Sequence, residues 1–372
     1  MSIIAAVHGV VPEHAYSQQE ITSELADVIF GRDDAGPKRA LMHRLHEAAG
    51  VDRRHLVLPL ERYRDLGGFG PANDVFLDAG TELAERAITG ALADAGLAAD
   101  DVDLVMSVSV TGIGAPSIEA RAHARLGLRS DVKRVPVFGL GCVAGAAGIA
   151  RLHDYLLGHP DDVAVLVSVE LCSLTFQADD ASTANLVSCG LFGDGAAAVV
   201  VVGDERAARL GLPAREGLSA REGLPGTAGP RVVATRSRLY PDTERVMGWD
   251  VGGSGFRIVL AATVADVVEK YLRDDVDAFL AGHGLAVADV GCWVAHPGGP
   301  KVIAAVTRAL DLPDDALELS RRHLAGRGNL SSSSVLQVLE STIAHRRPEP
   351  GTPGMLLAMG PGFCAELVLL EW

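Results

Sequence analysis

Three residues that could act together in one reaction each stand on a glycine-rich turn. They are Cys142 in the run GLGCVAG, His296 at the start of HPGGP, and Asn329 in GNLSSSS. A cysteine thiolate can accept an acyl group, while histidine and asparagine can donate hydrogen bonds to the oxygen of a second thioester. The set therefore predicts a condensation in which a malonyl unit loses CO2 and the stabilised enolate attacks the acyl group on the cysteine.

Each residue taken alone also has an ordinary structural interpretation, and these interpretations stay open. Cys142 among Gly, Val and Ala fits a small buried side chain. His296 ends an apolar run, as many structural histidines do, and Asn329 stands before a predicted helix that it could cap. The place of Cys142 at a strand-to-helix turn favours chemistry, because a helix N-terminus stabilises a thiolate and offers free N–H groups to an acyl oxyanion.

The turn around Cys142 also satisfies a different motif. GLGCVAG matches GxGxxG between a predicted strand and a predicted helix, and Glu170 closes the next predicted strand, where a ribose-binding acid would stand. An NAD-dependent dehydrogenase is therefore an alternative. A pyrophosphate-binding turn has no use for a thiol at its centre, so we prefer acyl transfer.

Composition limits the class of protein. The chain has 372 residues, 48% of them hydrophobic, and a net charge of −15. This length predicts two domains or two fused halves, and an acidic chain without clustered Lys and Arg argues against nucleic acid. The five cysteines include no CxxC pair, so we expect reduced thiols, no metal and a cytoplasmic location. No apolar run is long enough to span a membrane.

Hydrophobic periodicity predicts alternating strands and helices that must position the three residues. Predicted strands cover 2–10, 101–110, 135–138, 163–170, 196–202 and 291–295, and predicted helices cover 76–96, 118–126, 143–157 and 258–282. Further helices are expected after Pro300 and Leu330, and a strand pair flanks 360–362. Because β-α-β alternation occurs twice, we expect two similar α/β halves with buried, mostly parallel sheets covered by helices.

A segment of different composition divides these halves. Residues 214–218 (AREGL) recur at 220–224 within a polar, Gly- and Pro-bearing stretch, which is typical of a solvated surface connector. We therefore predict an N-terminal half at 1–203, a connector at 204–231 and a C-terminal half at 232–372.

Five blocks resemble the bacterial type III polyketide synthases, the chalcone synthase-like family of the thiolase superfamily. They are 139–145, 191–196 (LFGDGA), 295–300, 328–331 and 360–362 (GPG). The resemblance runs over nearly the whole chain. It implies a thiolase-like five-layered αβαβα fold made of two similar halves, and a cytoplasmic homodimer that acts on CoA thioesters without a cofactor or a metal.

The resemblance also implies roles for individual residues. Cys142 would carry the acyl group, His296 and Asn329 would decarboxylate malonyl-CoA and stabilise the enolate, and Phe192 with Phe256 would form a gate between the CoA tunnel and the cavity. Other residues implied in substrate binding are Cys172, Thr175, Ala115, Pro116, Met247, Ser331, Gly360, Pro361 and Gly362. The loop at Ala115 and Pro116 corresponds to one that reaches across the dimer in the family.

The expected CoA entrance departs from the family pattern. Leu41 and Ala48 stand where lysine is usual, so Arg44 is the best match, with Lys38 and Lys301 as substitutes. The starter could therefore arrive on CoA or on an acyl carrier protein.

The predicted function is a type III polyketide synthase that loads an acyl starter on Cys142, extends it with malonyl-CoA and releases a cyclised pyrone or phenolic product. The alternatives are a single-condensation ketoacyl synthase III-like enzyme, the dehydrogenase, and a non-enzymatic protein that binds acyl chains. The small side chain of Ala115 and the scarcity of aromatic residues favour an aliphatic starter in an apolar channel. If Ala115 only packs against a partner subunit, malonyl-CoA alone would prime the enzyme.

Overall fold

The computed structural model describes residues 1–32, 36–212 and 229–372. Its strands are β1 (Ser2–Val10), β2 (His14–Ser17), β3 (Arg53–Leu56), β4 (Leu104–Ser109), β5 (Lys133–Phe138), β6 (Val163–Leu171), β7 (Asp194–Gly203), β8 (Arg231–Leu239), β9 (Met247–Gly252), β10 (Gly255–Leu260), β11 (Cys292–Ala295), β12 (Pro353–Gly360) and β13 (Cys364–Glu371). Its α-helices are α1 (Gln18–Phe30), α2 (Pro37–Glu47), α3 (Phe69–Ala95), α4 (Ile118–Leu126), α5 (Ala144–Gly158), α6 (Thr183–Leu191), α7 (Asp204–Leu210), α8 (Val264–Ala281), α9 (Pro300–Leu310), α10 (Glu318–Arg327) and α11 (Ser332–His345).

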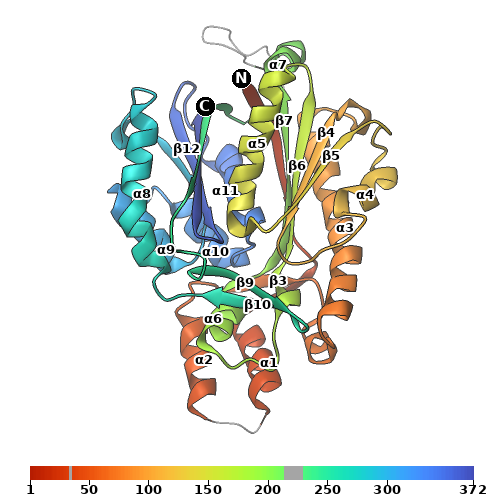
Figure 1. Cartoon of the computed structure of the whole chain (residues 1–372), viewed down its shortest axis with the longest axis vertical. Coiled ribbons are helices and arrows are strands. Elements are labelled where there is room, and N and C mark those ends of the chain that lie inside the picture. The colour runs from red at the N-terminus through yellow and green to blue at the C-terminus, as the bar shows by residue number, and fades with distance from the viewer. Residues whose placement is uncertain (33–35, 213–228) are drawn as a thin grey trace.

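Five layers of secondary structure follow one another across the molecule. Figure 1 shows α3 and α4 on one side, then the strands of the N-terminal half, then α5 and α11 in the middle. The strands of the C-terminal half and the outer helices α8 and α9 complete the sequence of layers. This is the predicted five-layered αβαβα arrangement of two halves.

Nine of the described strands form one sheet in the order β11-β12-β13-β8-β1-β7-β6-β4-β5, and β2 with β3 and β9 with β10 form two separate two-stranded sheets. The expectation of mostly parallel sheets is wrong, because only β11·β12, β4·β5 and β4·β6 are parallel neighbours. The other neighbours run antiparallel, and β1 joins the two halves through a short pairing with β8. Continuous apolar strands such as β7, in which every residue is buried, follow from helices on both faces and do not require parallel neighbours.

Three apolar cores hold the layers together. The central core contains α5 and α11 between the two groups of strands. One outer core lies under α3 and the other under α8 and α9. The small residues of α5 allow close packing: a Cβ on Gly148 would lie 2.5 Å from Leu166 Cδ1. This helix therefore positions its N-terminal end rigidly.

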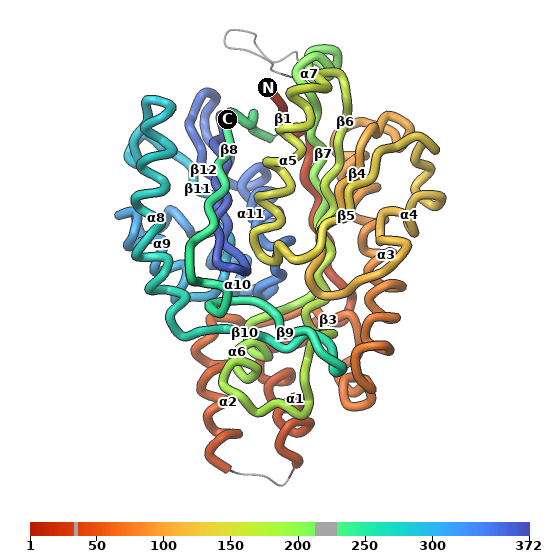
Figure 2. Tube along the Cα trace, viewed as in Figure 1, coloured from red at the N-terminus to blue at the C-terminus, as the bar shows by residue number. Residues whose placement is uncertain are grey.

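A smaller group of elements lies beneath the sheet. Figure 2 shows α1, α2 and α6 gathered below it, with the β9–β10 hairpin running across their upper side. α1 starts at a capping box, in which Ser17 N donates to the Glu20 carboxylate at 2.8 Å and the Ser17 side chain accepts from Glu20 N. An apolar cluster with Ile21 and Leu186 joins α1 to α6.

Two predicted boundaries change in the structure. The helix predicted from 258 begins at Val264, because residues 255–260 pair with β9 as a strand. The predicted connector begins with α7, whose Ala207 is buried, and its repeated segment lies outside the described residues. Among the residues that the structure describes, no helix has the length and hydropathy needed to cross a membrane.

Candidate active site

Cys142 stands on a turn that depends on glycine. The backbone leaves β5 at Phe138 and passes Gly139 and Gly141, whose φ angles are 99° and 56°. Glycine adopts this left-handed region without a steric penalty. A Cβ on Gly141 would also lie 2.6 Å from Pro361 Cδ. The turn therefore delivers the cysteine directly to the N-terminal end of α5.

Two further loops pack backbone to backbone against this turn. A Cβ on Gly145 would lie 2.3 Å from Ser332 O, and a Cβ on Gly360 would lie 2.8 Å from Val143 N. The turn is wedged between the start of α11 and the loop that follows β12. The cysteine side chain is only 6% exposed as a result.

Ser331 connects the cysteine to Asn329. Cys142 Sγ donates to Ser331 Oγ at 3.6 Å, and Ser331 N donates to Asn329 Oδ1 at 2.8 Å. Ser331 has a φ of 49°, which is uncommon for a residue with a side chain. Ser331, not Asn329, occupies the N-cap position of α11, so the capping interpretation of Asn329 is wrong.

Asn329 is tied through its backbone to the segment that carries Phe192. Asn329 N donates to Leu191 O at 2.9 Å, and Gly193 N donates to Asn329 O at 3.0 Å. The side-chain oxygen accepts the hydrogen bond from Ser331 N, whereas the side-chain NH2 makes only a long contact with the described residues, from Nδ2 to Gly298 O at 3.5 Å. The backbone of Asn329 is therefore fixed, while its side-chain donor remains weakly engaged.

His296 presents a buried ring that the protein does not satisfy. It follows β11, and its backbone N–H donates to Leu357 O at 2.9 Å. Ser320 Oγ donates to Ala295 O at 2.6 Å, which fixes the preceding residue. Both ring nitrogens of His296 are buried and have no partner among the described residues. Buried polar atoms are normally hydrogen-bonded, so this ring is available to a substrate oxygen or a water.

Burial keeps both reactive groups neutral in the closed site. It raises the pKa of Cys142 to about 12, more than the hydrogen bond from its thiol to Ser331 lowers it, and it lowers the pKa of His296 to about 4. Desolvation therefore opposes the thiolate that the helix N-terminus is expected to favour. The nucleophile has to lose its proton to a base during acylation.

A small pocket of about 20 Å³ opens at Cys142, and we call it the cysteine pocket. The predicted site residues that line it are Cys142, Cys172, Phe192, Met247, Ser331 and Pro361. His296 and Asn329 are buried beside this group but are not part of its lining. The structure thus brings five of the eleven predicted substrate-binding residues to this pocket, together with Cys142.

Sequence reasoning missed Trp249, which lines the cysteine pocket together with Ile258. Met247 and Trp249 lie two residues apart on β9. Residues at this spacing point to the same face of a strand. The position of Trp249 two residues after Met247 could therefore have identified it as a pocket residue. The aromatic ring narrows the pocket opposite Phe192.

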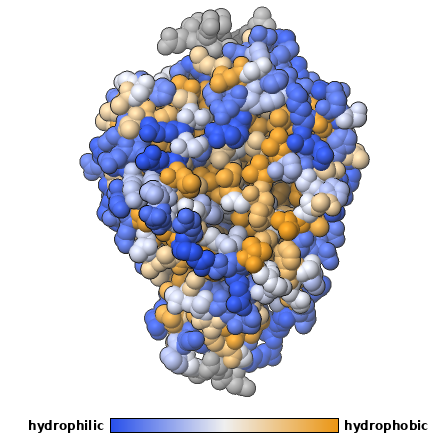
Figure 3. All heavy atoms as spheres, viewed as in Figure 1, coloured by the Kyte–Doolittle hydropathy of each residue, from blue (hydrophilic) through white to orange (hydrophobic). Residues whose placement is uncertain are grey.

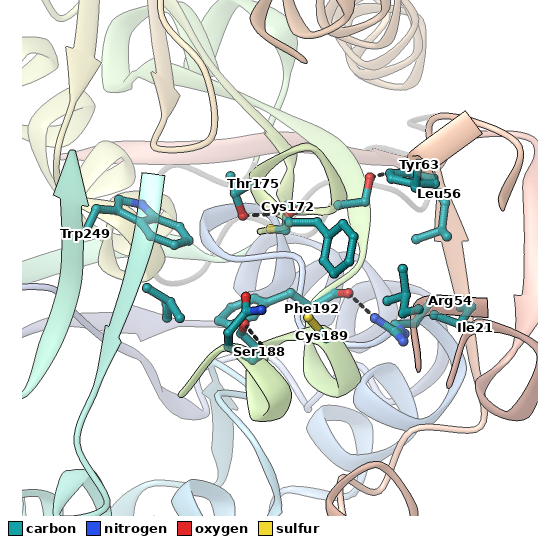
Figure 4. Close-up of a pocket in the computed structure, with 15 residues that line it drawn as sticks. Ile21, Arg54, Leu56, Tyr63, Cys172, Thr175, Ser188, Cys189, Phe192 and Trp249 are labelled. Atoms are coloured by element: carbon teal, nitrogen blue, oxygen red, sulfur yellow. Dashed lines mark hydrogen bonds between the residues drawn. The ribbon is translucent and has the colours of Figure 1, made fainter. Parts of the chain in front are cut away.

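A second pocket lies on the other side of Phe192, between α1, β3 and α6, and we call it the side pocket. Its volume is about 40 Å³. Thr175, which was predicted to face the cavity, lines this pocket and donates to Cys172 O at 2.8 Å. Figure 4 shows Phe192 at the centre of the side pocket and Arg54 at its edge. Sequence reasoning did not single out Arg54.

Phe256 does not reach the cysteine pocket. Its ring packs edge-on against Phe69, with centroids 5.3 Å apart, and lies 5.9 Å from the ring of Phe138 and 6.0 Å from that of Trp249. Phe192 lines both pockets, whereas Phe256 lines neither. The structure therefore separates the two members of the predicted gate.

The predicted entrance residues lie on the surface. Lys38 and Arg44 are exposed on α2, and Lys301 is exposed at the start of α9. The loop after α2 approaches that helix, since a Cβ on Gly50 would lie 3.6 Å from Pro300 Cγ. Ala115 and Pro116 are exposed on the loop after β4 and line neither pocket. Gly360 and Gly362 flank Pro361 on the turn that ends β12.

Glu170 is unavailable to a dinucleotide. Its carboxylate is fully buried and accepts from Val110 N at 3.1 Å, from Thr111 Oγ1 at 3.0 Å and from Ser332 Oγ. The GxGxxG turn is occupied by the packing around Cys142. The alternative of an NAD-dependent dehydrogenase is therefore wrong.

Comparisons with known proteins agree with this geometry. Residues 1–205 match the family model described as chalcone and stilbene synthases, N-terminal domain, and residues 231–371 match the corresponding C-terminal domain. The chain is 57% identical over 369 residues to the 1,3,6,8-tetrahydroxynaphthalene synthase of Streptomyces peucetius subsp. caesius, covering 99% of this chain and 93% of that protein. It is 29% identical to the phloroglucinol synthase of Pseudomonas fluorescens, covering 100% and 99%.

A solved structure is similar over the same length. The crystal structure of 1,3,6,8-tetrahydroxynaphthalene synthase from Streptomyces coelicolor A3(2), a bacterial type III polyketide synthase, superposes with a TM-score of 0.88 at 32% identity, covering 100% of this chain and 99% of that one. The predicted family, fold and decarboxylating acyl transfer on CoA thioesters are confirmed. This chain belongs to the chalcone and stilbene synthase family and is a type III polyketide synthase.

Proposed function

We propose that this enzyme builds a phenolic product of the tetrahydroxynaphthalene type from malonyl-CoA alone, using Cys142, His296 and Asn329. The observation that carries the proposal is the 57% identity, over nearly the whole chain, to a 1,3,6,8-tetrahydroxynaphthalene synthase. The cysteine pocket supports this proposal, because its lining combines the buried Cys142 thiol with apolar side chains. The division at 1–203 and 232–372 and the cytoplasmic location stay predictions.

Acylation is the first step of the proposed mechanism. The Cys142 thiol passes its proton to His296, and the thiolate attacks the thioester carbonyl of the starter. A carbon–sulfur bond forms, and the CoA sulfur leaves as a thiolate that takes the proton back from His296. The burial of both groups supports this transfer, because a neutral thiol and a neutral imidazole are the resting forms.

Decarboxylation of malonyl-CoA is the second step. The bond to the carboxylate breaks, CO2 leaves, and the electron pair moves onto the thioester oxygen, where His296 and Asn329 donate hydrogen bonds. The unpartnered ring of His296 and the weakly engaged amide of Asn329 support these roles. The enolate carbon then attacks the acyl carbonyl on Cys142, and the cysteine sulfur leaves. The extended chain is now a CoA thioester that returns to Cys142 for the next cycle.

Phe192 and Trp249 form the proposed gate. Both rings line the cysteine pocket, and Phe192 also closes the side pocket. Phe256 supports Trp249 from behind through the ring contact described above. Arg44 and Lys301 are proposed to bind the CoA phosphates, since their exposed charges stand near the neighbouring ends of α2 and α9, with Lys38 at the other end of α2 as a further contact. Delivery by a carrier protein remains the alternative.

We also propose a homodimer formed through β5. Among the strands that the structure describes, β5 pairs only with β4, and an unpaired strand edge is normally covered. Phe138 at its end is 49% exposed, and Ile113 beside it is 45% exposed. Figure 3 shows hydrophobic side chains gathered across the middle of the face, bounded by hydrophilic residues. A second copy would cover this surface and bring its Ala115–Pro116 loop to the site.

The homodimer is tested by Phe138→Asp, with Phe138→Leu as a control of the same position. Light scattering should give a dimer for the wild type and Phe138→Leu and a monomer for Phe138→Asp. A wild-type monomer at micromolar concentration would remove the proposal.

Product analysis tests the proposed function. Purified enzyme supplied only with malonyl-CoA should release an aromatic polyketide, identified by mass spectrometry. If product forms only when an aliphatic acyl-CoA is added, the starter is aliphatic and malonyl priming is wrong.

A further inference from the structure

Arg54 is a buried cation without a direct counter-ion. It lies on β3, is 2% exposed and forms no ion pair with the carboxylates that the structure describes. Its Nε donates to Gln18 Oε1 at 3.1 Å and its Nη1 donates to Phe192 O at 2.7 Å. Its Nη2 is buried without a partner among the described residues. Figure 4 shows this guanidinium pointing inward, toward Phe192.

The nearby carboxylate, that of Asp194, already accepts hydrogen bonds from other groups. Asp194 accepts from Val57 N at 2.7 Å and from Ser173 N at 2.8 Å. Burial lowers the pKa of Arg54 to about 10, so the guanidinium stays protonated at neutral pH. Buried charges are normally paired, because leaving one unpaired is costly. The side pocket thus holds a positive charge that lacks an anion.

The side pocket adjoins the cysteine pocket, and shared side chains separate the two. Cys172, Phe192, Trp249 and Ile258 line both. Each condensation inserts the new unit next to the thioester, so the starter end of the chain moves away from Cys142 as the chain grows. When malonyl is the starter, that distant end carries a carboxylate.

We infer that the side pocket receives the starter end of the growing chain and that Arg54 binds its carboxylate. This inference rests on the proposed malonyl priming. The donor left free at Nη2 and the charge of the guanidinium fit a carboxylate, which accepts charge-assisted hydrogen bonds. The contact of Nη1 with Phe192 O couples tail binding to the gate. The competing explanation is that Arg54 only braces the Phe192 segment.

A pair of variants at Cys189 separates these explanations, because both variants keep Arg54 and its hydrogen bond to Phe192 O. Cys189 lines the side pocket together with Arg54, and burial raises the pKa of its thiol to about 12, so the side chain is neutral. Cys189→Asp places a carboxylate beside the guanidinium, and Cys189→Asn is the neutral control of nearly the same shape. Cys189→Asp should lower the aromatic product formed per malonyl-CoA decarboxylated by about tenfold or more relative to Cys189→Asn. Equal ratios in the two variants would overturn the inference.

Variants of Arg54 provide an independent measurement. Arg54→Gln should lower the same ratio by about tenfold or more and cause short chains to accumulate on Cys142, detected by intact-protein mass spectrometry. Arg54→Lys should retain more of the ratio, because it keeps the charge. If Arg54→Gln lowers product formation and decarboxylation in the same proportion, Arg54 is only a brace. The same conclusion follows if Arg54→Gln and Arg54→Lys give equal ratios of product to decarboxylated malonyl-CoA.

Product formation by the wild type separates a failure of the proposed malonyl priming from a failure of the proposed role of Arg54. No aromatic product from malonyl-CoA alone would remove malonyl priming, and the inference with it. Product from the wild type together with equal Cys189 variants would remove only the role of Arg54.

Discussion

The turns that carry Cys142 and His296 are alike in sequence and different in packing. Each follows a short strand and precedes a helix, and each contains two glycines. Around Cys142 three backbone segments meet so closely that Gly141 and Gly145 admit no Cβ. Around His296 the backbone is fixed, but the ring has no hydrogen-bond partner. The N-terminal half thus supplies a rigid nucleophile, while the C-terminal half supplies donors that are left free for substrate.

Removing the nucleophile should have the largest effect. Cys142→Ala should lower product formation by roughly a thousandfold or more, because no acyl-enzyme can form. Malonyl-CoA decarboxylation should survive, since it depends on the other half. Cys292→Ala, a half-buried cysteine on β11, is the matched control. Release of full-length product by Cys142→Ala would show that the nucleophile lies elsewhere.

Removing the free donors should have the next largest effect. His296→Ala and Asn329→Ala should each slow malonyl-CoA decarboxylation by about a hundredfold or more, as loss of an oxyanion donor does. Acylation should suffer more in His296→Ala, because only His296 takes the proton of Cys142. Single-turnover acylation measured by mass spectrometry tests this division. Equal acylation rates in the two variants would contradict it.

Glycine substitutions compare the packing of the two turns directly. Gly141→Ala should cost roughly 1–3 kcal/mol of stability and much of the activity, because its φ is positive and its Cβ would meet Pro361. Gly139→Ala has the same backbone strain but open space around the Cβ, so it should cost less. Gly298→Ala beside His296 should be milder still, since its nearest contact is Val302 Cγ1 at 3.3 Å. Thermal unfolding orders the three variants, and a reversed order would refute the comparison.

The smallest expected effect is on the pH dependence of stability. Burial lowers the pKa of His296 and His46 to about 4 and that of His323 to about 3. Below the ordinary histidine pKa of 6.5 the unfolded chain binds protons that these folded sites exclude. Stability should therefore be full above about pH 6.5 and should fall as the pH decreases toward about 4.

A variant of one buried histidine tests this dependence. His323→Gln should reduce the loss of melting temperature between about pH 7 and about pH 5, because one proton-binding difference is removed. His345→Gln, at an exposed position, is the control. An unchanged slope in His323→Gln would mean that folding does not change the proton affinity of this histidine.

Local patterns predicted the elements around the site well. The helix predicted at 118–126 has the bounds of α4, and the strand predicted at 2–10 has those of β1. Their apolar spacing reflects contacts within one short segment. The run at 258–263 was misassigned, because its apolar residues suit a helix as well as the β10 strand, and only pairing with β9 decides between them.

Sheet order and the side pocket could not be predicted in the same way. Pairing of β1 with both β7 and β8 joins segments about two hundred residues apart. Arg54 stands next to an exposed Arg53 and has the sequence context of a surface residue. The alternation of a strand hints that one of the two points inward, but it cannot tell which.

The sequence by itself determined the types of the reacting residues, the glycine turns that carry them and the family, because these are recorded in short contiguous runs. Only the tertiary structure decided that Phe256 lies away from the cysteine pocket and that Asn329 is joined to the Phe192 segment. It also decided that Arg54 is buried with no ion pair to the described carboxylates and with Nη2 unpartnered among the described residues. The physical reason is that burial and pairing depend on segments remote in the chain, whose approach no local pattern encodes.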